Sequence, residues 1–100
     1  MKEKILEVLF TQAREMGAES GKKELLHPTT ETKLYHSNGN LDSLGLVGFI
    51  TGTEEKIADA FGVDIILVDE KAMSQVSSPF ISIQSLADYI EKLLAKEQAG

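Results

Sequence analysis

Leu41-Asp42-Ser43-Leu44 is the stretch that decides how this chain is organised. An aspartate and a serine ahead of an apolar-periodic run are typical of a helix start, because their side-chain oxygens accept hydrogen bonds from unpaired backbone N–H groups. The turn cluster Asn38-Gly39-Asn40 comes just before this stretch. We therefore predict a helix over residues 43–61 with a serine hydroxyl at its N-terminus.

The predicted helix 43–61 combines an apolar stripe with three glycines. The stripe consists of Val47, Ile50, Ile57, Ala58 and Phe61, with Leu46 and Phe49 beside it. Gly45, Gly48 and Gly52 each cost about 1 kcal/mol against alanine in a helix interior. Because they are three and four residues apart, they share one face, which we expect to lie away from the core. That face either docks a partner by close backbone contact or accommodates the domain's own long loop.

Two further amphipathic helices are predicted near the ends of the chain. The first covers residues 2–16 and ends at Gly17, with a buried stripe of Ile5, Val8, Leu9, Ala13 and Met16. The last begins after the N-cap Ser82 and runs to about Leu94. Its buried face consists of Ile83, Leu86, Ala87, Ile90, Leu93 and Leu94.

The segments between these helices have weaker patterns. Residues 18–41 predict a long irregular loop, which we expect to be anchored on the core by Leu25, Leu26, Leu34 and Tyr35. Val63–Val68 resembles a strand, but a lone strand is not stable, so we predict an extended connector that lines the core. The interior between the helix 43–61 and Ile65, Leu67 and Ile83 either shelters an apolar chain or forms solid core. We predict a short third helix over Asp69–Gln75. Ser77-Ser78-Pro79 follows and ends this helix.

The composition fits one acidic, folded domain. The chain has 100 residues, a formal net charge of −6 and no cysteine. We expect a single domain over residues 1–95 and a frayed tail over 96–100. The acidity argues against nucleic acid and anionic membranes as partners, and favours basic surfaces on partner proteins. The absence of a signal-peptide pattern and of long apolar runs predicts a cytoplasmic chain.

The chain resembles acyl carrier proteins. The resemblance is carried by Leu41-Asp42-Ser43-Leu44, by the long helix after it, and by Ser82–Ile90. The resemblance runs from the first helix to about Leu94. It implies an all-α, four-helix bundle with a short third helix and a long loop between helices one and two, whereas the patterns alone predict only a small helix bundle. In that family the serine of Asp-Ser-Leu carries 4′-phosphopantetheine, and only Ser43 matches this position.

The resemblance implies a stand-alone, monomeric carrier that is not itself an enzyme. A phosphopantetheinyl transferase would attach the group from coenzyme A to Ser43, and its thiol would carry an acyl or aminoacyl cargo as a thioester. A loading ligase and transfer enzymes are the further partners expected. We expect partner contacts at Asp42, Leu44, Gly45, Gly48 and Gly52.

This sequence departs from the family pattern in three places. The positions of Gly45 and Gly48 are acidic in typical fatty-acid carriers, the helix 43–61 has about one extra turn, and Ser74–Phe80 adds length before the last helix. These departures favour a specialised biosynthetic pathway. The alternatives are a carrier in general fatty acid synthesis, or a binding module without the prosthetic group, in which Ser43 is only a helix cap.

Other chemistries fit the residues less well. Ser43, His36 and Asp42 supply the residue types of a hydrolase triad, but the nucleophile elbow pattern and its preceding strand are missing. His27 and His36 without cysteine or spaced carboxylates make a poor metal site, so we predict no metal centre. Glu54, Glu55 and Asp59 predict a solvated face, with loose binding of a divalent ion as the alternative.

Overall fold

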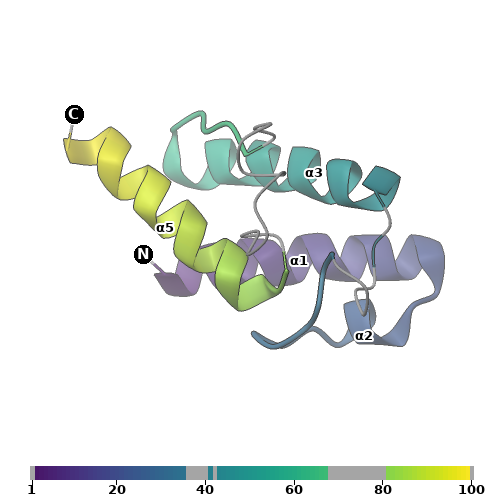
Figure 1. The fold of residues 1–100 in the computed structure, drawn as a ribbon. Helices are drawn as coiled ribbons and strands as arrows, with labels where there is room; N and C mark the ends of the chain where they lie inside the picture. The colour runs from purple at the N-terminus through teal and green to yellow at the C-terminus, as the bar shows by residue number, and fades with distance from the viewer. Residues whose placement is uncertain (1, 36–40, 42, 68–80, 100) are drawn as a thin grey trace.

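The described part of the protein is built from α-helices. The computed structural model describes residues 2–35, 41, 43–67 and 81–99. Its helices are α1 (Lys2–Ser20), α2 (Lys23–Leu26), α3 (Ser43–Phe61) and α5 (Ile83–Ala99) (Figure 1). Within these ranges β-type pairing is limited to one isolated antiparallel bridge between Lys33 and Ser82. The all-α prediction is confirmed, and none of these helices is long and apolar enough to span a membrane.

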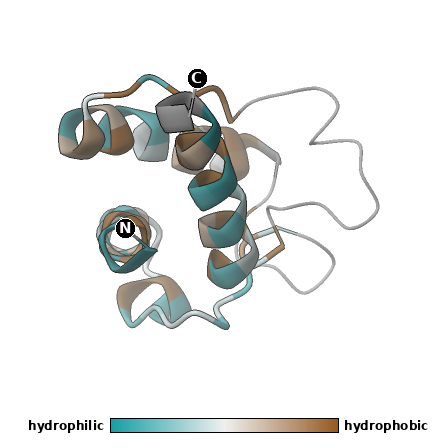
Figure 2. Ribbon diagram, turned by 90° about the vertical axis from the view of Figure 1, so that its left-hand side faces the viewer, coloured by the Kyte–Doolittle hydropathy of each residue, from teal (hydrophilic) through white to brown (hydrophobic). Residues whose placement is uncertain are grey.

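α1 is the central helix of the domain. It packs against α2, α3 and α5, which surround it in the view along its axis in Figure 2. The predicted stripe is largely confirmed, because Ile5, Leu9 and Ala13 are fully buried. An ion pair between the side chains of Lys2 and Asp88 adds a polar contact from α1 to α5.

The predicted end of α1 at Gly17 is wrong. The helix continues to Ser20, and Gly21 ends it with a φ of 75°, a conformation that favours glycine. Gly17 is buried inside the helix, where a Cβ would lie 2.8 Å from the backbone nitrogen of Leu26. This glycine therefore allows close approach of α2 and does not terminate α1.

The segment predicted as an irregular loop contains the short helix α2. Four residues carry too little periodicity to predict a helix, and α2 forms through its packing against α1. Three of the predicted anchors are confirmed, because Leu25 and Leu34 belong to the core and the half-buried Tyr35 packs against it, whereas Leu26 is only half-buried.

α3 has the predicted bounds but a rotated buried face. The residues that face the core are Leu46, Phe49, Ile50, Thr53 and Ile57, all with no exposed surface. Val47 was predicted to be core and is 41% exposed, since it lies about 100° around the helix from Leu46. Thr53 is polar and was missed; its hydroxyl donates to the carbonyl of Phe49 at 2.8 Å, which allows its burial.

From residue 63 to residue 67 the chain after α3 is neither helix nor strand and lines the core, as predicted. Gly62 ends α3 with a φ of 68°. Ile65 and Leu67 belong to the hydrophobic core, while Ile66 between them is 75% exposed. The backbone N–H of Leu67 donates to Oε2 of Glu54 at 2.5 Å, which holds the connector along α3. The predicted third helix Asp69–Gln75 and the added segment Ser74–Phe80 lie outside the described residues.

α5 begins after Ser82 as predicted. The Ser82 hydroxyl accepts from the backbone N–H of Ser85 at 3.2 Å, and the Ser85 hydroxyl accepts from the N–H of Ser82 at 3.0 Å. The buried face contains Ile83, Leu86, Ala87, Ile90 and Leu94. The helix continues past Leu94 to Ala99, so the helical structure reaches into the segment expected to be a frayed tail.

Candidate functional site

The candidate site is the beginning of α3. Ser43 is the first residue of this helix, as the sequence predicts. The first N–H groups of a helix lack intrahelical partners, and the helix dipole adds partial positive charge there. Leu41, just before the helix, is buried at 9% exposure and donates its N–H to the carbonyl of Leu34 at 2.8 Å. Asp42 lies outside the described residues.

Large apolar side chains are exposed next to Ser43. Leu44 is 84% exposed and Val47 is 41% exposed. The two are three residues apart, so they lie side by side on the helix surface. Leu44 was among the expected partner contacts, whereas Val47 was assigned to the core. The buried face of α3 contains Leu46, Phe49 and Ile50, and Val47 lies outside it.

The three glycines of α3 do not form one open face. Gly48 is exposed, with no other group within 4 Å of a Cβ built there, and Gly45 is half-buried. At Gly52 a Cβ would lie 2.4 Å from Nε2 of Gln12. α1 therefore covers this end of the glycine row, and the expectation of a continuous open face is wrong. The group approaching Gly52 belongs to α1 rather than to the long loop that the alternative invoked.

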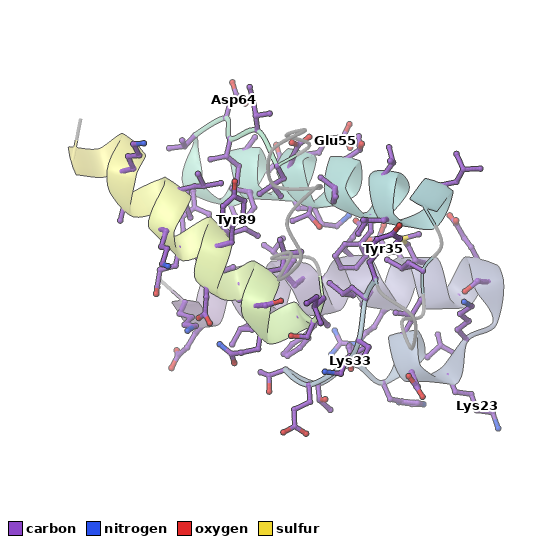
Figure 3. All side chains as sticks on the ribbon, viewed as in Figure 1. Lys23, Lys33, Tyr35, Glu55, Asp64 and Tyr89 are labelled. Carbon is purple, nitrogen blue, oxygen red and sulfur yellow. The ribbon has the colours of Figure 1, made fainter. Side chains whose placement is uncertain are left out.

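The charged residues of α3 are divided between its two sides. Lys56 turns toward α1, where its Nζ donates to Oε1 of Gln12 at 2.7 Å and lies 3.1 Å from Oε2 of Glu15. Glu55 and Asp59 are exposed, and Glu55 points away from α1, on the same side as Asp64 of the connector (Figure 3). The outer side of α3 is thus apolar near Ser43 and acidic toward its C-terminal end.

The structure tests the alternative metal chemistry only in part. No group of three or more His, Asp and Glu side chains within the described ranges could hold a metal ion. Glu54, assigned to a solvated face, is half-buried and accepts from the connector, while Glu55 and Asp59 are exposed. His27 is exposed after α2. His36 lies outside the described residues, as Asp42 does, so the hydrolase triad is not tested.

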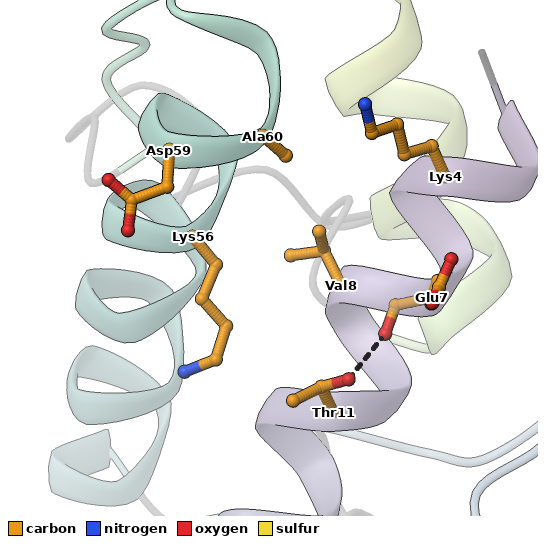
Figure 4. Close-up of a pocket in the computed structure, with 7 residues that line it drawn as sticks. All are labelled: Lys4, Glu7, Val8, Thr11, Lys56, Asp59 and Ala60. Carbon is orange, nitrogen blue, oxygen red and sulfur yellow. Dashed lines mark hydrogen bonds between the residues drawn. The ribbon is translucent and has the colours of Figure 1, made fainter.

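A groove of about 350 Å³ lies between α1 and α3 (Figure 4). Its lining residues are Lys4, Glu7, Val8, Thr11, Lys56, Asp59 and Ala60. Lys56 follows Ser43 by more than three helical turns, which places the groove about 20 Å along the axis from the start of α3. The groove is therefore separate from the candidate site.

Comparison of the chain with protein-family models, curated proteins and solved structures finds no match. The assignment of a function therefore depends on the residues and their arrangement.

Proposed function

We propose that this protein is a stand-alone acyl or aminoacyl carrier of a specialised biosynthetic pathway, with 4′-phosphopantetheine attached to Ser43. The observation that carries the proposal is the position of Ser43 as the first residue of α3, directly followed by the 84% exposed Leu44. The exposed leucine offers a modifying enzyme an apolar contact directly beside the residue that it would modify. The supporting sequence feature is Asp-Ser-Leu, with helices before and after it at the spacing of acyl carrier proteins.

The chemistry of a helix start fits the proposed modification. The attached group would join Ser43 through an anionic phosphodiester, and a helix N-terminus favours an anion by about 0.3–1 kcal/mol. When bound, the group supplies a thiol that holds the cargo as a thioester. The protein itself contributes a fixed attachment point, which raises the effective concentration of the cargo at each enzyme visited.

The outer side of α3 suggests how partner enzymes would bind. Leu44 and Val47 offer an apolar contact beside Ser43, and Glu55 and Asp59 offer negative charge further along the helix. A transferase or loading ligase with an apolar contact and a basic rim would complement this surface. Gly45 and Gly48 replace the acidic residues that typical fatty-acid carriers have next to the serine. This difference favours a dedicated set of partners over a general fatty acid synthase.

Mass spectrometry of the intact protein tests the proposal. Incubation with coenzyme A, magnesium and a broad-specificity phosphopantetheinyl transferase should add one phosphopantetheine to the wild-type chain. Ser43→Ala should remain unmodified and keep its helical circular dichroism, because the loss of a cap costs only about 1 kcal/mol. Ser20→Ala is the matched control, since Ser20 is an exposed helical serine that bonds only to its own helix, and this variant should be modified like the wild type.

Two outcomes would contradict the proposal. Modification of Ser43→Ala would show that another residue carries the group. A wild-type chain that several transferases leave unmodified, and that carries no group when purified from its native source, would favour the binding module in which Ser43 only caps α3.

A further inference from the structure

The start of α5 is bound to the segment that precedes α3 in the chain. A helix leaves its first N–H groups without intrahelical partners. In α5 the N–H of Ile83 donates to the carbonyl of Thr32 at 3.1 Å, and that of Gln84 donates to the carbonyl of Thr30 at 2.9 Å. The next N–H, of Ser85, is bonded to the Ser82 hydroxyl. Residues 30–32 thus take part in capping α5.

The capping segment contains a hydrogen-bonded turn of its own. The backbone N–H of Thr29 donates to Oγ1 of Thr32 at 2.8 Å, and the N–H of Thr32 donates to the carbonyl of Thr29 at 3.1 Å. The hydroxyl of Thr29 accepts in addition from the N–H of Glu31 at 3.2 Å. Thr32 is only 9% exposed. These local bonds fix the carbonyls that face α5.

Leu34 connects this segment with the residue next to the start of α3. Its N–H donates to the carbonyl of Ile81 at 2.8 Å, and its carbonyl accepts from the N–H of Leu41 at 2.8 Å. Leu34 has no exposed surface, so water does not compete for its backbone N–H and carbonyl groups. One residue therefore joins the chain before α5 to the chain before α3.

We infer that Leu34 is a positioning residue, which holds the N-terminus of α3, and with it Ser43, at a fixed place relative to the chain that enters α5. This inference rests on the proposed function, in which Ser43 must be presented to a transferase. Weakening either backbone bond of Leu34 frees the first turn of α3 while the buried stripes of α1, α3 and α5 keep the bundle folded.

The test replaces single amide bonds by ester bonds in the chemically synthesised full chain. Leucic acid at position 41 or 34 removes the N–H that binds Leu34 or Ile81 and keeps the leucine side chain. Leucic acid at position 26 is the matched control, because the Leu26 N–H donates to the carbonyl of Lys22, the residue just before α2, at 3.2 Å. Removing one backbone hydrogen bond shifts a local opening equilibrium by roughly fivefold.

Two readouts separate positioning from general stability. Amide hydrogen exchange at residues 46–49 should be about fivefold faster in the chains altered at 41 or 34 than in the chain altered at 26. The KM of the transferase for these chains should rise, and kcat should be unchanged, because only the fraction of competent chains falls.

Each contrary result has a distinct meaning. Equal exchange at residues 46–49 in all three altered chains would overturn the positioning role. Faster exchange with an unchanged KM would show that the junction does not control the presentation of Ser43. The exchange readout needs no modification of Ser43, so failure of the proposed function, seen as an unmodified wild-type chain, is distinguishable from failure of this inference.

Discussion

Gln12 of α1 lies over Gly52 of α3, so closely that a Cβ at position 52 would be 2.4 Å from its Nε2 atom. Gln12 is 7% exposed, and its Oε1 accepts from Lys56 at 2.7 Å. The missing side chain of Gly52 therefore makes room for a buried amide that links the two helices. Gly48, one turn earlier, has no such neighbour, so the two glycines have different roles in the same helix.

This difference predicts opposite effects of the same substitution. Gly48→Ala should stabilise the protein by about 0.5–1 kcal/mol, because alanine has the higher helix propensity and the space is open. Gly52→Ala gains the same propensity but must displace Gln12 and its hydrogen bond, which costs about 1–3 kcal/mol. Urea unfolding of both variants measures the difference. A Gly52→Ala protein as stable as Gly48→Ala would show that Gln12 moves away freely.

The packing of α5 makes a second prediction. Ile90 has no exposed surface, so Ile90→Ala should destabilise the domain by about 2–5 kcal/mol. Lys92 is exposed, and Lys92→Ala should change the free energy of unfolding by less than about 0.5 kcal/mol. Equal effects of the two substitutions in chemical denaturation would contradict the assigned face of α5.

The ion pair between Lys2 and Asp88 makes a third prediction, on pH. The hydrogen bond from Lys2 holds the pKa of Asp88 below its ordinary value of 3.8, and the bond to Asp88 holds the pKa of Lys2 above 10.5. Because the pKa of the Asp88 carboxyl is lowered in the folded protein, its pairing stabilises the fold above pH 3.8. This stabilisation is lost as the pH falls through the lowered pKa. Because the pKa of Lys2 is raised in the folded protein, its pairing stabilises the fold below pH 10.5. This stabilisation is lost as the pH rises through the raised pKa.

Lys2→Gln should therefore raise the pKa of Asp88, measured by NMR titration of its carboxyl carbon. The difference in unfolding free energy between wild type and Lys2→Gln should shrink in strong acid and in strong base. Lys23→Gln, which removes an exposed lysine from α2, is the control and should leave the Asp88 titration unchanged. An unchanged pKa of Asp88 in Lys2→Gln would contradict the pairing.

The features that the sequence predicts well are those set by local patterns. The bounds of α3 and the start of α5 follow from Ser43 and Ser82 and from apolar spacing. Close approach of two elements is a property of the fold, so the local sequence predicts a helix end at Gly17 and an open face at Gly52, and both predictions are wrong. Val47 and Thr53 show the same limit, because the rotation of α3 depends on what packs against it. At the candidate site, the place of Ser43 follows from its sequence, while the link through Leu34 joins residues far apart in the chain.

The last prediction concerns the exposed apolar surface beside Ser43. Leu44→Ala should lower kcat/KM for modification by the transferase by about fivefold or more, because a central apolar contact is worth over about 1 kcal/mol at an interface. Ile66→Ala is the matched control, since Ile66 is 75% exposed but lies on the connector, and it should react like the wild type. Neither change should alter stability by more than about 0.5 kcal/mol.

Gly48, which lies on the same side of α3 as Leu44, extends this prediction to partner choice. Gly48→Ala and Gly48→Glu should both weaken loading by the dedicated ligase, because each adds bulk where a partner approaches the backbone. Gly48→Glu should in addition improve recognition by fatty-acid enzymes, since it restores the acidic residue of typical fatty-acid carriers. Steady-state kinetics with both kinds of enzyme measure these effects. An unchanged kcat/KM of Leu44→Ala and of both Gly48 variants would show that partners dock elsewhere.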